Sequence, residues 1–298
     1  MTDLLVAART IHFASTATVA GAILFRWVVV EPAFRQLRVR DTSAQAELRD
    51  LQRVVWLSLA LTLVSGALWV IALAKIIGGE VSVVLIATSF GRVWLVRLVL
   101  AALVLLCELL RSTVPSAIAA ACLMGSLAWS GHAAGTPAIL GDVHRAADVL
   151  HLVAAAAWLG GLLPLGLLLR RSLQTDGEPL ALAVASATRR FSTLGIVAVM
   201  TLLGTGLVNA WTLVGDPKAL LDTRYGQLLL LKVMLFLTMV AIAAYNRGSL
   251  TPRLPEAVAM GQLARNAFAE AGLGLAILVI ISVLGVLPPV SYMGIPGH

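Results

Sequence analysis

Eight apolar stretches, each about as long as a membrane-spanning helix, constrain this chain more than any other feature of its sequence. A helix needs about 20 mostly apolar residues to cross the hydrocarbon core of a bilayer. Only helices and closed barrels satisfy their backbone hydrogen bonds there, so the expected fold is all-α, a polytopic membrane helix bundle. The expected spanning segments are 6–29, 53–75, 92–111, 114–133, 146–169, 191–214, 226–246 and 268–288.

The composition supports a membrane protein and argues against a nucleic-acid partner. Of the 298 residues, 59% are hydrophobic and 12% are charged, whereas soluble domains carry about 25% charged residues. The net charge of +7 comes largely from arginines in short connections between apolar segments, where positive charge sets membrane orientation. The lipid bilayer is therefore the expected surrounding, and the whole chain, 1–298, is expected to form one membrane domain.

The arginines also predict the orientation. Positive charge is concentrated in the connections after the first, third, fifth and seventh segments, which the positive-inside rule places in the cytoplasm. Both termini are then expected on the periplasmic side of a bacterial inner membrane. Arg97 and Lys232, near the outer ends of their segments, are expected to extend their charged groups toward the interface or to line a polar cavity.

The sequence contains paired features that predict an internal repeat. Each partner lies 135 to 140 residues after its counterpart: His12 and His151, Gly21 and Gly160, Ser65-Gly66 and Thr205-Gly206, Gly91 and Gly226, Arg97 and Lys232. Four helices in each unit give both units the same orientation, which makes the repeat parallel. The expected halves are 1–134 and 142–298, in the four-plus-four plan that some transporters use.

Histidines are the candidate metal ligands. All five lie on the expected outer side, and His12, His132, His144 and His151 are the predicted metal-binding set, with His298 in the tail. Imidazole nitrogen suits copper, zinc, iron and nickel. Asp148 falls within about 60° of His144 and His151 on one helix face, so it is expected to orient a histidine or to offset the charge of a bound cation.

Motifs for soluble enzyme chemistry are missing from the sequence. It has no phosphate-binding loop for ATP, no CxxC metal site and no nucleophile elbow. The chain is therefore not expected to be an enzyme.

Several stretches give the sequence a family resemblance. The run from His144 to Gly161, Tyr225-Gly226 with Lys232, Ala244-Tyr-Asn246-Arg247, Leu250-Thr-Pro252 and the Ser130-Gly-His132-Ala133 turn resemble the CopD family of copper-resistance membrane proteins. The resemblance implies copper as the bound metal and copper uptake across the bacterial inner membrane. It also implies a periplasmic copper-binding partner similar to CopC, which is expected to be a separate protein because no such domain is fused here.

Two other functions are compatible with the same residues. The repeat-related His12 and His151 are a possible pair of axial ligands for haem iron in a membrane redox protein. A structural or assembly factor without metal is the third hypothesis. An optical spectrum and metal analysis of the purified protein distinguish the three.

Overall fold

Helices account for all the regular structure in the described part of the chain, which in this computed structural model is residues 2–38, 42–130, 138–175, 178–213 and 219–287. The predicted all-α class is confirmed, and eight helical segments are long and apolar enough to cross a membrane. The first four spans contain α1 (Thr2–Leu24) with η1 (Phe25–Val30) and α2 (Glu31–Gln36), α3 (Thr42–Ile77), α5 (Ser89–Leu109), and α6 (Thr113–Gly125) with η2 (Ser126–Ser130). The last four contain α7 (Ala138–Ser172), α8 (Glu178–Leu213), α10 (Arg224–Tyr245) with η4 (Asn246–Leu250) and η5 (Thr251–Arg253), and α11 (Ala257–Leu284). Two short helices, α4 (Val81–Ala87) and α9 (Ala219–Asp222), precede α5 and α10.

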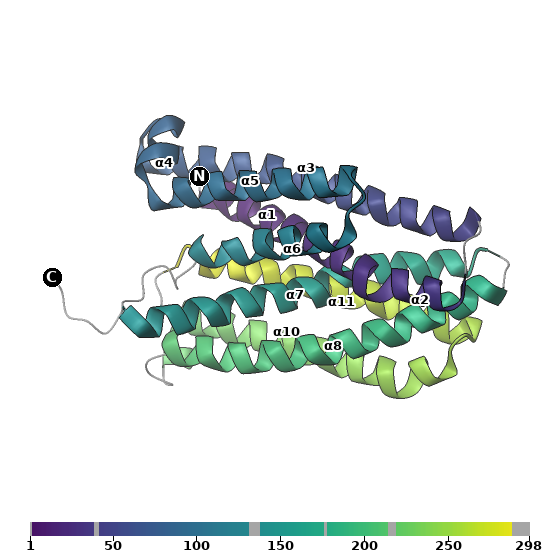
Figure 1. The fold of residues 1–298 in the computed structure, drawn as a ribbon. Helices are drawn as coiled ribbons and strands as arrows, with labels where there is room; N and C mark the ends of the chain where they lie inside the picture. The colour runs from purple at the N-terminus through teal and green to yellow at the C-terminus, as the bar shows by residue number, and fades with distance from the viewer. Residues whose placement is uncertain (1, 39–41, 131–137, 176–177, 214–218, 288–298) are drawn as a thin grey trace.

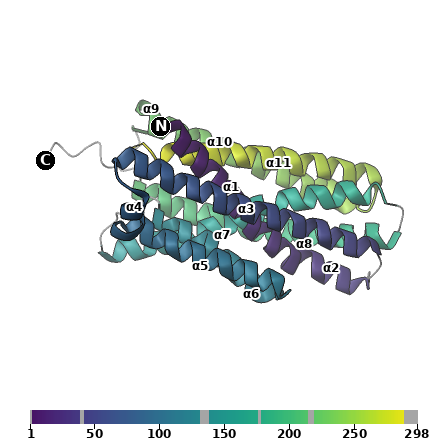
Figure 2. The ribbon, with the colours of Figure 1, turned by 90° about the horizontal axis from the view of Figure 1, so that it is seen from above.

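The helices form two groups that meet along the middle of the bundle. The helices from α1 to η2 are called the N-half below, and those from α7 to α11 the C-half. Helices α3, α4 and α5 lie along one side of the bundle and α8 and α10 along the other, with α1 and α7 between them (Figure 1), whereas the view from above in Figure 2 has helices of the N-half in front of α7 and α8. Helix α1 contacts α3, α6, α7 and α11, whereas α7 contacts α8, α11, α1 and α6.

The two central helices cross at glycines. A Cβ atom on Gly21 would overlap the backbone of Ala156 and Gly160, and a Cβ atom on Gly160 would overlap the backbone of Ala17 and Gly21. Each helix therefore contributes an alanine and, four positions later, a glycine to the contact. This spacing of small residues lets membrane helices approach closely. The contact is reciprocal, since Ala17 and Gly21 occupy the positions that Ala156 and Gly160 occupy 139 residues later.

Other contacts also occur in equivalent pairs in the two halves. The side chain of Thr88 accepts a hydrogen bond from Gly91 N at the start of α5 (2.9 Å), and Thr223 accepts one from Gly226 N at the start of α10 (3.0 Å). The packing of α1 on α3, α5 on α6 and α4 on α5 is matched by that of α7 on α8, α10 on α11 and α9 on α10. These are the pairs that a four-plus-four arrangement requires, while the repeat itself stays a prediction.

Most of the described residues between the first and second and between the fifth and sixth expected spans, 30–52 and 170–190, are helical, so these helices are longer than the expected spans. Helix α3 begins at Thr42 and helix α7 continues to Ser172. At 1.5 Å per residue, the 36 residues of α3 extend about 54 Å, well beyond a hydrocarbon core of about 30 Å. Ion pairs link these extensions, because Arg171 lies 3.3 Å from Glu47 and also pairs with Asp50. The length of an apolar stretch identifies only the part of a helix that lies inside the membrane. The charged extensions beyond that part were therefore not predicted.

The outer helices present apolar side chains to the bilayer. Helices α5, α8 and α10 are the least enclosed of the spanning segments. Exposed apolar residues follow their outward faces, among them Val99, Leu106, Val197, Leu207 and Leu237. Polar and charged groups in the spanning region are instead gathered inside the bundle, where membrane proteins place their functional groups.

Candidate functional site

The predicted histidine face of α7 carries a polar cluster in the C-half. His144 is buried and His151 is partly buried, two turns apart on the helix. Asn209 of α8 donates a hydrogen bond to Asp148 Oδ1 (2.6 Å), and Lys232 of α10 interacts electrostatically with both Asp148 and His151. This C-half histidine site therefore joins three helices near the beginning of α7.

The hydrogen bonds of His151 determine which ring nitrogen can bind a metal. His151 Nδ1 lies 2.9 Å from Thr205 Oγ1 on α8. The Thr205 hydroxyl donates its proton to Thr201 O (2.6 Å), so it accepts from His151 Nδ1. The neutral ring then has its lone pair on Nε2. A hydrogen bond that fixes the tautomer in this way is typical of histidines that ligate metals.

His12 has an equivalent arrangement in the N-half. Its Nδ1 lies 3.1 Å from Thr62 O and 3.4 Å from Ser65 Oγ, both on α3. Since a carbonyl oxygen only accepts, Nδ1 carries the proton and Nε2 has the lone pair. His12 Nε2 is buried and makes no hydrogen bond within the described residues. The hydroxyls of Ser65 and Thr205 thus contact the two histidines that the predicted repeat pairs.

The surroundings of His12 are aromatic and positively charged. The rings of Trp69 and Trp94 lie 5.6 and 5.4 Å from the imidazole, measured between centroids. The guanidinium carbons of Arg9 and Arg97 lie 5.1 and 5.7 Å from the centre of the Trp69 ring. The positive charge of these two arginines opposes a bound cation near His12, so His12 is a less favourable ligand than His151.

Arg97 does not extend to the interface, which corrects one expectation for this residue. Its side chain is buried and donates from Nε to Ser126 Oγ (3.2 Å) and from Nη2 to Ser126 O (3.0 Å). These bonds coincide with the change from α6 to the 3₁₀ turn η2, where backbone carbonyls lose their α-helical partners. The polar groups at the end of α6 hold the guanidinium inside the bundle.

The structure describes only some of the predicted metal-binding residues. His132 and His298 lie outside the described residues. Within the described ranges, no three His, Cys, Asp or Glu side chains are grouped so that they could hold a metal ion. The complete set of His12, His132, His144 and His151 therefore stays a prediction, with His144, Asp148 and His151 located together on α7.

The histidine geometry also bears on the haem hypothesis. Two axial ligands of one haem must face each other across its plane. The His12 ring instead contacts α3 and α5, and the His151 ring contacts α8, each within its own half. The arrangement does not favour one haem held between these two residues.

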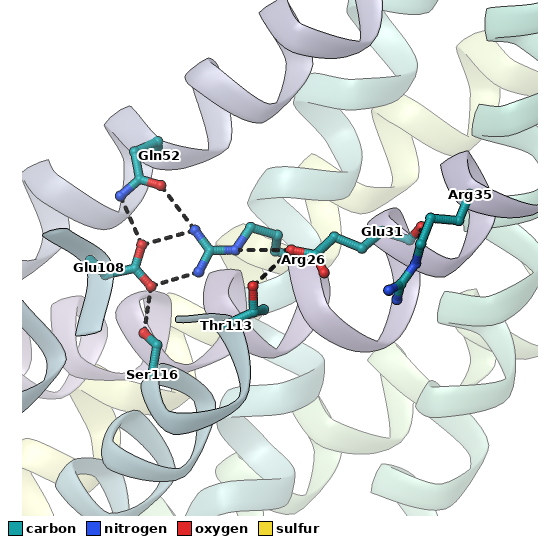
Figure 3. A network of polar contacts seen from close by, with 7 residues as sticks. All are labelled: Arg26, Glu31, Arg35, Gln52, Glu108, Thr113 and Ser116. Carbon is teal, nitrogen blue, oxygen red and sulfur yellow. Dashed lines mark hydrogen bonds and ion pairs between the residues drawn. The ribbon is translucent and has the colours of Figure 1, made fainter. Parts of the chain in front are cut away.

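An ion-pair network that the sequence analysis missed occupies the N-half. Arg26, in the π-helical turn η1, donates to both carboxylate oxygens of Glu108 at 2.8 and 2.6 Å (Figure 3). Gln52 Nε2 and Ser116 Oγ also donate to this carboxylate. On its other side, the Arg26 guanidinium lies 3.8 Å from Glu31. The sequence contained a signal for this network, because Arg26 and Glu108 carry opposite charges and each lies within an expected apolar stretch. Charged side chains inside a membrane usually pair with one another.

The fold and its polar sites define a multi-pass membrane protein with histidine and carboxylate clusters inside a helical bundle. The model of copper resistance protein D matches residues 185–284, and that of the copper resistance protein D-like N-terminal domain matches residues 1–142. The chain belongs to the copper resistance protein D family.

Curated relatives extend this assignment along the chain. The inner membrane protein YebZ of Escherichia coli (strain K12) is 32% identical over 95% of this chain and 98% of its own length. Copper resistance protein D of Pseudomonas syringae pv. tomato is 32% identical over 68% of this chain and 69% of its own. Copper transport protein CutJ of Bacillus subtilis (strain 168) is 33% identical over 47% of this chain and 25% of its own. No solved structure matches the chain.

The family makes this a copper-related membrane protein, and the relationship to YebZ supports a multi-pass location in the inner membrane. The descriptions of the relatives name copper resistance and copper transport. The expectation that the chain is not an enzyme stays a prediction.

Proposed function

We propose that this protein captures copper at the periplasmic end of α7 and carries it into the cell. His151 is the central ligand of the proposed site, with His144, His132 and His12 as the further predicted ligands. The single observation that carries the proposal is the hydrogen bond from His151 Nδ1 to Thr205, which leaves Nε2 as an available metal ligand. A soluble periplasmic protein that binds copper is the partner expected to deliver the ion.

The charge distribution around His151 supports capture of a cation more than that around His12. Asp148 lies one turn before His151 and is held by Asn209, so a carboxylate accompanies the imidazole. Imidazole nitrogen with carboxylate oxygen suits Cu²⁺, whereas thioethers and thiolates select Cu⁺. Lys232 opposes a cation here, and its interaction with Asp148 reduces that opposition.

Replacing His151 by alanine is expected to weaken copper binding by about 10-fold or more, because even partners of metal ligands contribute 10- to 100-fold. Copper affinity would be measured by equilibrium dialysis of the purified protein followed by metal analysis. His298→Ala is the control, since it removes a histidine from the tail and is expected to retain the wild-type affinity.

The same samples separate the alternative functions. An unchanged copper affinity in His151→Ala would rule out this ligand assignment. A strong Soret absorption band in the purified protein would favour the haem hypothesis instead. A wild-type protein that retains no metal would point to a structural or assembly role.

The proposed capture site requires the beginning of α7 to face the periplasm. We expect a cysteine at Glu80 to react with a membrane-impermeant maleimide in intact cells, and one at Gln174 to react only after permeabilisation. Both side chains are exposed, and Cys107 and Cys122 would be replaced by serine beforehand. Reaction at position 174 in intact cells would reverse the orientation and place the histidines on the cytoplasmic side.

A further inference from the structure

A cavity of about 230 Å³, partly open to the outside of the bundle, lies in the C-half between α7, α8, α10, η4 and α11, with the exposed Ile196 and Met200 in its lining. Its walls are mostly apolar, and its lining includes five residues with oxygen-bearing side chains: Thr188, Ser192, Asn246, Thr251 and Glu270. At about 30 Å³ per molecule, the volume corresponds to about eight waters. The cavity therefore has room for a cation with a hydration shell.

Glu270 is the unusual group in this cavity. It is 2% exposed, and its Oε1 accepts a hydrogen bond from Asn246 Nδ2 (2.9 Å). Asn266 in turn donates to Asn246 Oδ1 (2.5 Å), which orients the Asn246 amide. Glu270 Oε2 is buried and makes no hydrogen bond within the described residues. Leaving a buried polar atom without a partner is energetically unfavourable, and more so when the atom is charged, so such an atom requires an explanation.

The N-half shows how this protein satisfies a buried carboxylate when its role is structural. Glu108 accepts hydrogen bonds from Arg26, Gln52 and Ser116, and the Arg26 side chain occupies the space beside it (Figure 3). Among the described residues, no guanidinium makes a comparable contact with Glu270. Arg247 belongs to the cavity lining, but it is exposed and donates to Ser192 (2.9 Å).

The predicted repeat relates the two regions. The positions of Arg26, Gln52 and Glu108 correspond, at offsets of 139, 140 and 135 residues, to Leu165, Ser192 and Ala243. All three of these residues line the C-half cavity. The ion pair of the N-half is thus replaced by small or apolar side chains, and a cavity lies in the corresponding place. Its carboxylate comes from a different position, on α11.

The cavity lies further along the helix that carries the histidine site. Trp158 lines it and lies seven residues, about two turns, after His151 on the same face of α7. Gly206, beside the His151 ring, and Ser192 both belong to α8. The helices that position the histidine site therefore also enclose the cavity, closer to the ends of α7 and α10.

We propose that this cavity is an inner cation site, in which the Glu270 carboxylate and neighbouring oxygen atoms bind a hydrated divalent cation. Oxygen donors disfavour Cu⁺ and suit divalent ions, so Cu²⁺ released from the histidine site is the expected occupant. The identity of the ion rests on the proposed copper function, whereas the cation site rests on the cavity and Glu270. Glu270 supplies the negative charge that offsets the cost of a cation at this depth.

Chemical modification tests the site directly. In liposomes containing the purified full-length protein, dicyclohexylcarbodiimide is expected to modify Glu270, as measured by mass spectrometry of its peptide. Cu²⁺ is expected to reduce the modification several-fold, and Na⁺ at the same concentration is expected to leave it unchanged. Modification that Cu²⁺ does not reduce, or that Na⁺ reduces equally, would overturn the proposal. Glu108 is the internal comparison, because its ion pair should leave it unmodified with or without copper.

Transport through the same liposomes provides the second measurement. Glu270→Gln preserves the shape of the side chain and an oxygen for Asn246, and should lower copper flux about 10-fold or more if the carboxylate is a ligand. Copper binding that depends on His151 should persist in this variant. Glu256→Gln, an exposed carboxylate at the start of α11, is the matched control and should transport like the wild type. Unchanged flux in Glu270→Gln would overturn the inner site while leaving the histidine proposal intact. If the wild type carries no copper, the transport proposal fails, and protection of Glu270 by Cu²⁺ decides the cation site alone.

Discussion

Replacement of Arg26 by methionine is expected to destabilise the protein by about 3–5 kcal/mol, the usual cost of leaving one member of a buried ion pair without its partner. Methionine removes the guanidinium while keeping an unbranched apolar side chain. Glu108 would retain Gln52 and Ser116 as donors, but its charge would be uncompensated. Thermal unfolding in one detergent should show a melting temperature lower by roughly 10 °C.

Two further variants isolate the cause of that loss. In Arg26→Met combined with Glu108→Gln, no charge remains, and we expect more than half of the lost stability to return. Arg53→Met is the surface control, because Arg53 pairs with Asp50 but its side chain is 75% exposed, and exposed pairs contribute at most about 1 kcal/mol. A double variant no more stable than Arg26→Met would show that the charge imbalance is not responsible.

The sequence predicts the number and class of the helices because hydrophobic length is a local property. Each spanning helix contains an apolar stretch that can be recognised without its neighbours, and the described residues contain the eight that were expected. Helix ends depend on non-local contacts as well. Arg171 pairs with Glu47 across more than a hundred residues, and the end of α6 depends on Arg97. The residue pattern within one segment does not show which distant residues that segment will contact.

The candidate sites divide in the same way. The face shared by His144, Asp148 and His151 follows from helical spacing, and the structure keeps these residues on α7. Their surroundings do not follow from spacing. The positive charges near His12 come from Arg9 and from Arg97, and the latter belongs to another helix. The cavity beside Glu270 depends on which side chains are small on four helices, a property that only the assembled bundle reveals.

The two halves have similar helix packing but different interiors. Histidines with equivalent hydrogen bonds occur in both, yet the N-half surrounds its histidine with guanidinium groups and fills its inner region with an ion pair. The C-half has a carboxylate near its histidine and an open cavity further along the bundle. The predicted repeat, with a structural role for the N-half and the proposed ion sites in the C-half, is consistent with these differences. It also predicts that the contact between α1 and α7, which joins the halves, is essential to both.

That contact leads to the second large effect, because Gly160→Leu is expected to destabilise the protein by about 3 kcal/mol or more. Overpacking a well-packed interior typically costs about 1–3 kcal/mol, and here the added atoms meet backbone rather than flexible side chains. A Cβ atom at position 160 already overlaps Ala17 O, so α1 and α7 must separate. The separation would weaken van der Waals contact along the crossing, which stabilises helix pairs in membranes where the hydrophobic effect does not.

The measurement for this variant is the fraction of monodisperse protein recovered by size-exclusion chromatography, together with the thermal unfolding midpoint. Gly160→Ala should show a smaller loss in the same direction, because it adds only the Cβ atom. Gly204→Leu is the matched control, since Gly204 lies in α8 with open space around the position of a Cβ atom. It should retain the wild-type midpoint. Equal stability of Gly160→Leu and Gly204→Leu would contradict the close crossing of α1 and α7, and with it the reciprocal contact that links the two halves.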